Sequence, residues 1–366
     1  MPRELKLERI EIRPVCRTVK DWFPTRESAE AVIPAILAHI KATGRTYDCF
    51  CHTHTPPPEG AVPVYIGEFS LPDRFLKAKR FSPCPCCWPE VGKFGHGRIA
   101  WFRDERVIRL IGEDCFQSLN PEAHRQARSI YEAERERRRT TEFLLSNAGN
   151  VPRVLNVIRE AVPVAKAIEL FHDLLHDRFK TVALSLRPWI GSNGELSVWL
   201  QEEDFRRETS DQMYTKEVSA MRPFAILQGF EMVTRAKLHF SNVLERCTEQ
   251  LMEYDYGPGW RIKIAAFDDE QRAEAADTLS KAVKAARDIL AKMREVRRFT
   301  EPIAINTLRN WGSHRGCPIP FNYSHNGSTI TFGPSDYKMV GVPLSSDLQL
   351  HIGEIEFWTP MEHKRR

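Results

Sequence analysis

Apolar residues recur at helical spacing over much of the chain. The pattern predicts a helix from Thr25 to Gly44 that Pro34 should kink, and a second from Asn120 to about Ser146, where proline follows an asparagine N-cap. Further helices are expected over 154–179, with an interruption at Pro163, and over 230–254, 268–299 and 300–312. Helix should therefore dominate the middle of the chain.

Strand patterns are shorter and lie mainly near the two ends. Alternation of apolar and polar residues predicts strands over 5–12, 98–102, 107–111 and 260–267, and near the C-terminus over 319–323, 329–332 and 348–358. A hairpin is expected to pair 181–186 with 196–200, because Asn193-Gly194 between them tolerates the positive φ angles of a tight turn.

The order of these elements predicts an α+β protein in three parts. Residues 1–119 should form a mixed, Cys-rich, zinc-binding domain, and residues 120–315 a mainly helical domain with an inserted β-hairpin. Residues 316–366 should form a small antiparallel β unit with a basic tail. A chain of 366 residues suits two or three domains.

Charge and composition add little about partners. The chain has 53 basic and 49 acidic side chains, a net charge of +4, which is far from the strongly basic balance of a dedicated nucleic-acid binder. The first residues are charged where a secretory signal would be apolar, and no run approaches the roughly 18 apolar residues of a membrane span. We expect a cytoplasmic protein without membrane contact.

Cysteine is the residue type that points to chemistry. Seven of the nine cysteines lie in the first third of the chain, beside His52, His54 and His96. In a reducing compartment such crowding favours metal ligation over disulfides.

The motif that carries most information begins at Cys84-Pro85-Cys86-Cys87, which has the Cys-x-x-Cys spacing of a zinc-binding turn. The two strands expected over 98–102 and 107–111 follow it. Cys115 then begins a predicted helix, whose N-terminal dipole would favour a thiolate. This order of turn, hairpin and helix resembles the treble-clef zinc modules, over residues 84–119. The resemblance implies a bound Zn²⁺ with Cys84, Cys87 and Cys115 as ligands.

The fourth ligand is open. Many treble clefs take a second ligand three residues into the helix, where this chain has Ser118. His96, between two glycines, is the first choice, Cys86 the second, and a donor from the cluster Cys49 to His54 the third. The alternative for Cys84, Cys87 and Cys115 is that they are small buried side chains.

Two other groups of residues could bind metal. Cys49, Cys51, His52 and His54 could form a second zinc site, perhaps joined by Cys16, although their spacing is tight. His172 and His176 have the i, i+4 relation of zinc hydrolases, but Asp173 stands where those enzymes have glutamate. Histidines of an exposed or interface surface are the other interpretation.

A basic stripe on the helix expected over 268–299 suggests a partner. It consists of Lys281, Lys284, Arg287, Arg294 and Arg298, at spacings of three, four or seven residues. Such a stripe could follow a phosphate backbone, or it could be a solvated helix face.

These features lead to one functional hypothesis and two alternatives. We expect a zinc-stabilised, non-enzymatic protein that binds DNA or RNA, or a complex containing it. The first alternative is a protein-interaction or assembly protein, binding a partner or a second copy through long amphipathic helices. The second is an enzyme with an unrecognised site, for which His172, Asp173 and His176 are the candidates.

Overall fold

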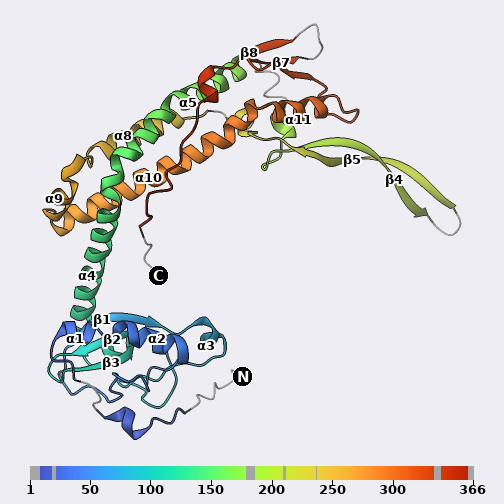
Figure 1. Cartoon of the computed structure of the whole chain (residues 1–366). Coiled ribbons are helices and arrows are strands. Elements are labelled where there is room, and N and C mark those ends of the chain that lie inside the picture. Colours follow the sequence, from blue (N-terminus) through green and yellow to red (C-terminus); the bar gives the residue numbers. More distant parts are fainter. Residues whose placement is uncertain are drawn as a thin grey trace. The chain divides into compact units, whose positions relative to one another are not determined.

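The computed structural model describes residues 9–18, 22–178, 186–208, 212–235, 237–333 and 339–361. The chain forms two compact units, Met1–Arg138 (unit 1) and Arg139–Arg366 (unit 2), and the division falls within helix α4 (Pro121–Asn147). Both units combine helix with antiparallel sheet (Figure 1). The predicted division into three parts stays a prediction.

Unit 1 is built on a three-stranded antiparallel sheet. Strands β1 (Pro63–Ser70), β2 (His96–Phe102) and β3 (Val107–Gly112) lie in the order β1-β2-β3. The expected hairpin of β2 and β3 is confirmed, with Phe102 opposite Val107 beside the turn. Strand β1 was not predicted, although its run Val64-Tyr-Ile is typical of a strand.

Short helices surround this sheet. They are α1 (Arg26–Glu30), α2 (Ile33–Thr43) and α3 (Asp73–Lys77), with 3-10 turns η1 (Pro14–Arg17) and η2 (Cys115–Ser118). Helices α1 and α2 pack against β1 (Figure 1). The expected ends are confirmed, because Thr25 forms a capping box and Gly44 takes a φ of 67° after α2.

Two parts of the N-terminal prediction were wrong. The helix expected from Thr25 to Gly44 breaks between α1 and α2, where Pro34 lies in the first turn of a new helix, a position that needs no N–H donor. Of the strand expected over 5–12, residues 5–8 lie outside the described residues. Residues 10–12 have no strand structure, and Arg9 makes only an isolated bridge to Val91.

Unit 2 has a core of three long helices. Helices α5 (Val151–Arg178), α8 (Phe240–Met252) and α10 (Asp269–Arg297) contact one another (Figure 1). The apolar stripe of α10 is buried between them; its members are Leu279, Val283, Ala286, Leu290, Met293 and Val296. Asp268 and Gln271 form the expected capping box of α10, and α11 (Pro302–Gly312) follows it as expected.

Three expectations for unit 2 were wrong in instructive ways. Helix α5 is continuous, because Pro163 lies on its exposed face, where water can hydrogen-bond the carbonyl that lost its N–H partner. The helix expected over 230–254 breaks after α7 (Glu231–Thr234), where Arg235 is extended. Residues 260–265 form helix α9 (Trp260–Ala265) in place of a strand, with Ile264 buried and Ile262 exposed.

A β-hairpin is inserted in unit 2 as expected, but one of its two strands differs from the prediction. The Asn193-Gly194 turn forms, with Gly194 at a φ of 84°, but it joins only an isolated bridge between Ile190 and Leu196. Strand β4 (Glu195–Glu208) pairs instead with β5 (Gln212–Ile226) in a long two-stranded ribbon (Figure 1). Of the first strand of the expected hairpin, 181–186, residues 181–185 lie outside the described residues, and Leu186 has no strand structure.

The C-terminal β unit is confirmed in outline. Strands β6 (Asn322–His325), β7 (Thr329–Gly333) and β8 (Val340–Pro343) form an antiparallel sheet. The strand expected over 348–358 is absent from these described residues, where a 3-10 turn η8 (Ser346–Gln349) is followed by irregular chain. The segment needs no sheet partner, because Arg287 and Arg297 on α10 donate hydrogen bonds to its carbonyls.

In the described ranges, none of the helices combines the length and apolar character needed to cross a membrane.

Burial on α10 gives a prediction for stability. Leu290→Ala should lower the free energy of unfolding by about 2–5 kcal/mol, because Leu290 is 1% exposed and its loss leaves a cavity. The same substitution at Leu170, a helical position that is 57% exposed, should cost no more than about 0.5 kcal/mol. Urea unfolding followed by circular dichroism measures both, and equal losses would contradict the packing described.

Candidate metal centre

The turn that begins at Cys84 is held by paired backbone hydrogen bonds. Cys84 and Trp88 each donate an N–H to the other's carbonyl, at 3.1 Å, and this closes the loop containing Cys86 and Cys87. One step further out, Ser82 pairs with Phe94 in the same way. Residues 82–94 therefore form a small knuckle whose tip carries three cysteines.

Three sulfurs meet where this knuckle reaches the end of β3. The Sγ atoms of Cys84, Cys87 and Cys115 all lie within 4.8 Å of one another, and those of Cys87 and Cys115 are 3.2 Å apart. Cys84 is buried, whereas the other two are half-buried. The structure thus brings together the three cysteines that the spacing singled out, in a group that can hold a metal ion.

Hydrogen bonding among the thiols favours one thiolate in this group. The thiols of Cys115, Cys86 and Cys87 hydrogen-bond the Cys84 sulfur and lower the pKa of Cys84, and the Gly112 N–H adds to the effect at 3.5 Å. The same bonds to Cys84, with burial next, raise the pKa of the other three cysteines. Crowded sulfurs of this kind gain from a cation that neutralises several thiolates at once.

Gly112 is required by the approach of Cys115. A Cβ atom at position 112 would lie 2.5 Å from Cys115 Sγ and 3.3 Å from the ring of Phe94. Any side chain there would displace the sulfur. The sequence motif Ile-Gly-x-x-Cys thus has a steric explanation, in which the glycine leaves the volume that the ligand atom occupies.

A tetrahedral metal site needs a fourth ligand, and the sequence offered His96 and Cys86 as the first two candidates. His96 is exposed at the start of β2, where its Nδ1 lies 2.9 Å from the hydroxyl of Ser70, and it does not belong to the group of three sulfurs. Cys86 does not belong to that group either, but it lies close enough to Cys84 for the Cys84 sulfur to raise the pKa of its thiol. Cys86 is therefore the candidate nearer to the three sulfurs.

The histidines of the second cluster use their ring nitrogens for hydrogen bonds. His52 Nδ1 accepts the N–H of Leu110 at 3.0 Å, so its Nε2 must carry the proton that it shares with His54 Nδ1 at 2.9 Å. His54 Nε2 then donates to the carbonyl of Pro89 at 2.8 Å. This chain of bonds fixes both neutral tautomers and joins β3 to the knuckle.

No second metal group is formed by these residues in the described part of the chain. Cys49 and Cys51 are buried with their sulfurs 3.9 Å apart, and Cys16 is buried as well. The cluster lies in the core of unit 1, where it connects the loop before β1 to the sheet.

His172 and His176 are likewise held by the backbone. Their rings are 4.3 Å apart, and their Nε2 atoms donate to the carbonyls of Arg235 and Met232, at 3.1 and 3.2 Å. Asp173 is exposed and lies 3.2 Å from Nδ1 of His172. The pair fastens α5 to the end of α7, and the nitrogens that a hydrolytic zinc would need are already engaged.

The predicted basic stripe on α10 is largely paired within unit 2. Arg287 donates to the carbonyls of Ile355 and Trp358, and Arg294 forms an ion pair with Glu354. Lys281 and Arg298 are exposed but lie near acids on the same helix, Asp277 at 2.7 Å and Glu295 at 3.4 Å. Lys284 is exposed and forms no ion pair with any described residue.

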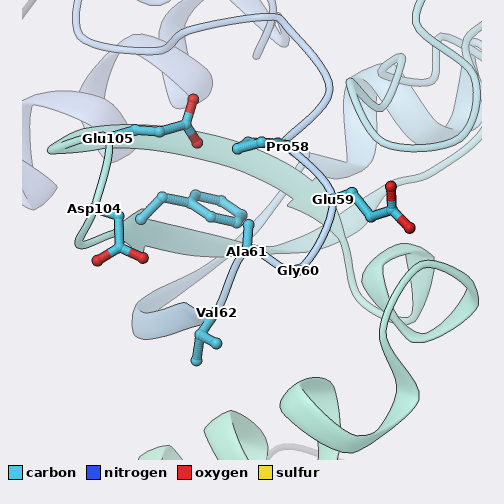
Figure 2. A pocket seen from close by; sticks show the side chains of 8 residues that line it. Pro58, Glu59, Gly60, Ala61, Val62, Asp104 and Glu105 are labelled. Atoms are coloured by element: carbon cyan, nitrogen blue, oxygen red, sulfur yellow. The ribbon is translucent and has the colours of Figure 1, made fainter.

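A hollow of about 110 Å³ lies beside the β2–β3 turn, lined by residues 58–62 and by Phe102, Asp104 and Glu105. Figure 2 shows the carboxylates of Glu59, Asp104 and Glu105 turned in different directions. Glu105 is also engaged by Arg109 at 2.6 Å. The hollow is smaller than ordinary ligand pockets and does not bring two acids together for general acid–base work.

Metal content tests the ligand set. We expect about one zinc per chain in the wild type and a loss of bound metal in Cys115→Ser, because three sulfurs must act together. His96→Ala should retain the metal, whereas Cys86→Ser should bind it more weakly. Elemental analysis after dialysis against a competing chelator measures all four proteins; metal loss in His96→Ala with retention in Cys86→Ser would contradict the assignment.

The histidine pair gives a prediction for pH dependence. Burial, and then the neighbouring His172, lower the pKa of His176 below its usual 6.5, so the fold favours the neutral ring. Below pH about 6.5 the unfolded chain binds a proton that the folded chain resists, and stability should fall as the pH falls. In His176→Gln this loss should be smaller.

Urea unfolding between pH about 7.5 and 5 measures the dependence. His351→Gln, at an exposed position, is the matched control and should behave as the wild type. A His176→Gln protein with the full wild-type loss would show that other groups cause it.

Comparison with known proteins adds no relative to this picture. No protein-family model, curated protein or solved structure matches the chain. Function has to be argued from the residues of this protein alone.

Proposed function

We propose that the protein is a zinc-stabilised, non-enzymatic protein that binds nucleic acid. The proposal has two parts, a structural zinc centre in unit 1 and a cationic surface beside it. Each part is supported by different residues and is tested separately.

Zinc fits the sulfur cluster by geometry and by ligand type. A tetrahedron with zinc–sulfur bonds of about 2.3 Å places its sulfurs about 3.8 Å apart, which is comparable with the separations among Cys84, Cys87 and Cys115. Cys86 supplies the fourth sulfur. Knuckle, β2–β3 hairpin and Cys115 follow in the order of a treble clef, although Cys115 begins the 3-10 turn η2, and the next helix starts only at Pro121.

A centre with four thiolates stabilises structure and does not catalyse. Catalytic zinc keeps one position open for water or substrate, whereas structural zinc has all four positions filled by protein. Cys84, Cys86, Cys87 and Cys115 would fill them. The metal would then fix the shape of the knuckle and of the surface around it.

The surface of the knuckle and of the residues just before it is the proposed binding site for nucleic acid. Lys77, Lys79, Arg80 and Lys93 are all exposed, lie in or next to the knuckle, and form no ion pair with another described residue. This is the observation that carries the assignment, because unpaired exposed cations are free to contact phosphates. The stripe on α10 provides less, since most of its cations have partners in unit 2.

The alternative of an assembly protein is not supported by helix α10. The apolar face of α10 is covered by α5 and α8 of the same unit. A partner helix could bind there only by displacing the core.

A charge-reversal pair tests the proposed function. The variant with Lys77, Lys79, Arg80 and Lys93 changed to Glu should bind labelled DNA and RNA at least about tenfold more weakly than the wild type at low salt. The matched control changes Lys281, Lys284 and Arg298 on α10 to Glu and should retain most of the affinity. Fluorescence anisotropy measures binding, and metal content shows that the knuckle is intact.

The outcomes separate the two surfaces. A wild-type protein that binds neither DNA nor RNA at low salt would refute the function. Loss of binding in the α10 variant alone would place the interface on unit 2.

A further inference from the structure

Two large aromatic side chains are exposed among the cations of the knuckle. Trp88, directly after Cys87, is 47% exposed, and Phe81, directly after Arg80, is 40% exposed. Aromatic rings of this size are usually buried, and exposing both in one short segment costs hydrophobic free energy. Binding of phosphates by the neighbouring cations does not explain why these two rings are exposed.

The backbone pairing of the knuckle places these rings next to a cation. Ser82 and Phe94 are directly paired and turn toward the core, where Ser82 is buried. Phe81 and Lys93, the chain neighbours of this pair, are both exposed, and the carbonyl of Ser82 also accepts the N–H of Lys93 at 3.0 Å. Lys93 Nζ lies 5.3 Å from the centre of the Trp88 ring, so Lys93 and Trp88 share one surface, and Phe81 is exposed next to the residue that pairs with Lys93.

Acidic side chains do little to neutralise this surface. Glu90, in the same knuckle, forms an ion pair with Arg17 at 2.6 Å. Asp73 lies at the start of α3, the end away from Lys77, Lys79 and Arg80. A polyanion approaching the knuckle therefore meets mainly unpaired positive charge.

We infer that this knuckle surface, formed by Lys77, Lys79, Arg80, Phe81, Trp88 and Lys93, binds single-stranded nucleic acid by stacking bases on Trp88 and Phe81. The inference rests on the proposed function and names its ligand class. Exposed rings interleaved with cations match a single strand, whose bases and phosphates are both accessible. In a duplex the faces of the bases are stacked on one another and cannot reach the rings.

A metal ion at the three sulfurs would make this surface rigid. Trp88 follows Cys87 directly, and its backbone is paired with Cys84, so two of the candidate ligands hold its position. A ring held in place loses little conformational freedom when a base stacks on it. Binding should therefore depend on the metal as well as on the rings.

Paired aromatic substitutions test the inference. The probes are an oligothymidylate and an oligouridylate of about 20 nucleotides and a DNA duplex of the same length. The wild type should bind the single strands at least about tenfold more tightly than the duplex. Trp88→Leu and Phe81→Leu should each weaken single-strand binding at least about fivefold, the effect of losing one stacked base, and should leave duplex binding unchanged.

Two controls make the result specific. Trp22, which is 66% exposed and lies under Arg106 at 4.8 Å, is the matched exposed tryptophan, and Trp22→Leu should bind as the wild type. Trp88→Phe keeps a stacking ring and should restore most of the affinity. Metal content equal to that of the wild type shows in each variant that the knuckle has folded.

Salt dependence separates stacking from charge. The logarithm of the single-strand binding constant falls with the logarithm of salt by about 0.7 for each phosphate contact. Changing Lys93 to Gln should reduce this slope, whereas Trp88→Leu should lower affinity at every salt concentration with the slope preserved.

Failure of the inference differs from failure of the function. Equal binding of duplex and single strand, or wild-type affinity in both leucine variants, would overturn the stacking surface and leave a nucleic-acid binder of another kind. Binding to phosphatidylserine vesicles without binding to any oligonucleotide would overturn both and identify a membrane-facing surface.

Discussion

The contact between the end of β3 and the Cys84 sulfur is the constraint on which unit 1 depends. The Gly112 N–H lies 3.5 Å from that sulfur, and the missing side chain of Gly112 leaves room for Cys115 Sγ. One residue thus joins the hairpin, the knuckle and the following turn. Because the backbone pairing of Cys84 with Trp88 closes a loop that contains Cys87, a metal ion bound here would order residues 82–94 as a whole. The surface that carries Lys93 and Trp88 is part of the same loop.

The rest of unit 1 explains why a metal would be used. Its interior contains polar groups that need fixed partners, including Arg98 between Glu68 and Glu113, and Arg109 on Glu105 and the carbonyl of Thr55. All four ring nitrogens of His52 and His54 are hydrogen-bonded, and these bonds connect β3 with the knuckle. Buried polar groups of this kind contribute little net stability but define one arrangement. A metal ion bound by the three sulfurs would supply stability at the position where they converge.

Local signals predicted the elements well where one residue determines the outcome. Asp268, Thr25 and Gly44 mark helix ends through hydrogen bonds or a positive φ within a few residues. The sulfur group was predicted from the spacing Cys84-x-x-Cys87 and from the order of turn, hairpin and Cys115 that follows it. What could not be predicted from the sequence depends on distant partners: β5 as the partner of β4, and the carbonyls that Arg287 binds. The sequence shows that Trp88 and Phe81 are aromatic, but their exposure to solvent, which makes them candidates for binding a ligand, is known only from the structure.

The central claim is a zinc centre closed by four sulfurs, and zinc K-edge X-ray absorption of the purified protein tests it most directly. The account predicts a first shell of four sulfur scatterers at about 2.3 Å, from Cys84, Cys86, Cys87 and Cys115. A shell with a nitrogen or oxygen scatterer at about 2.0 Å, or a protein that retains no zinc, would contradict it.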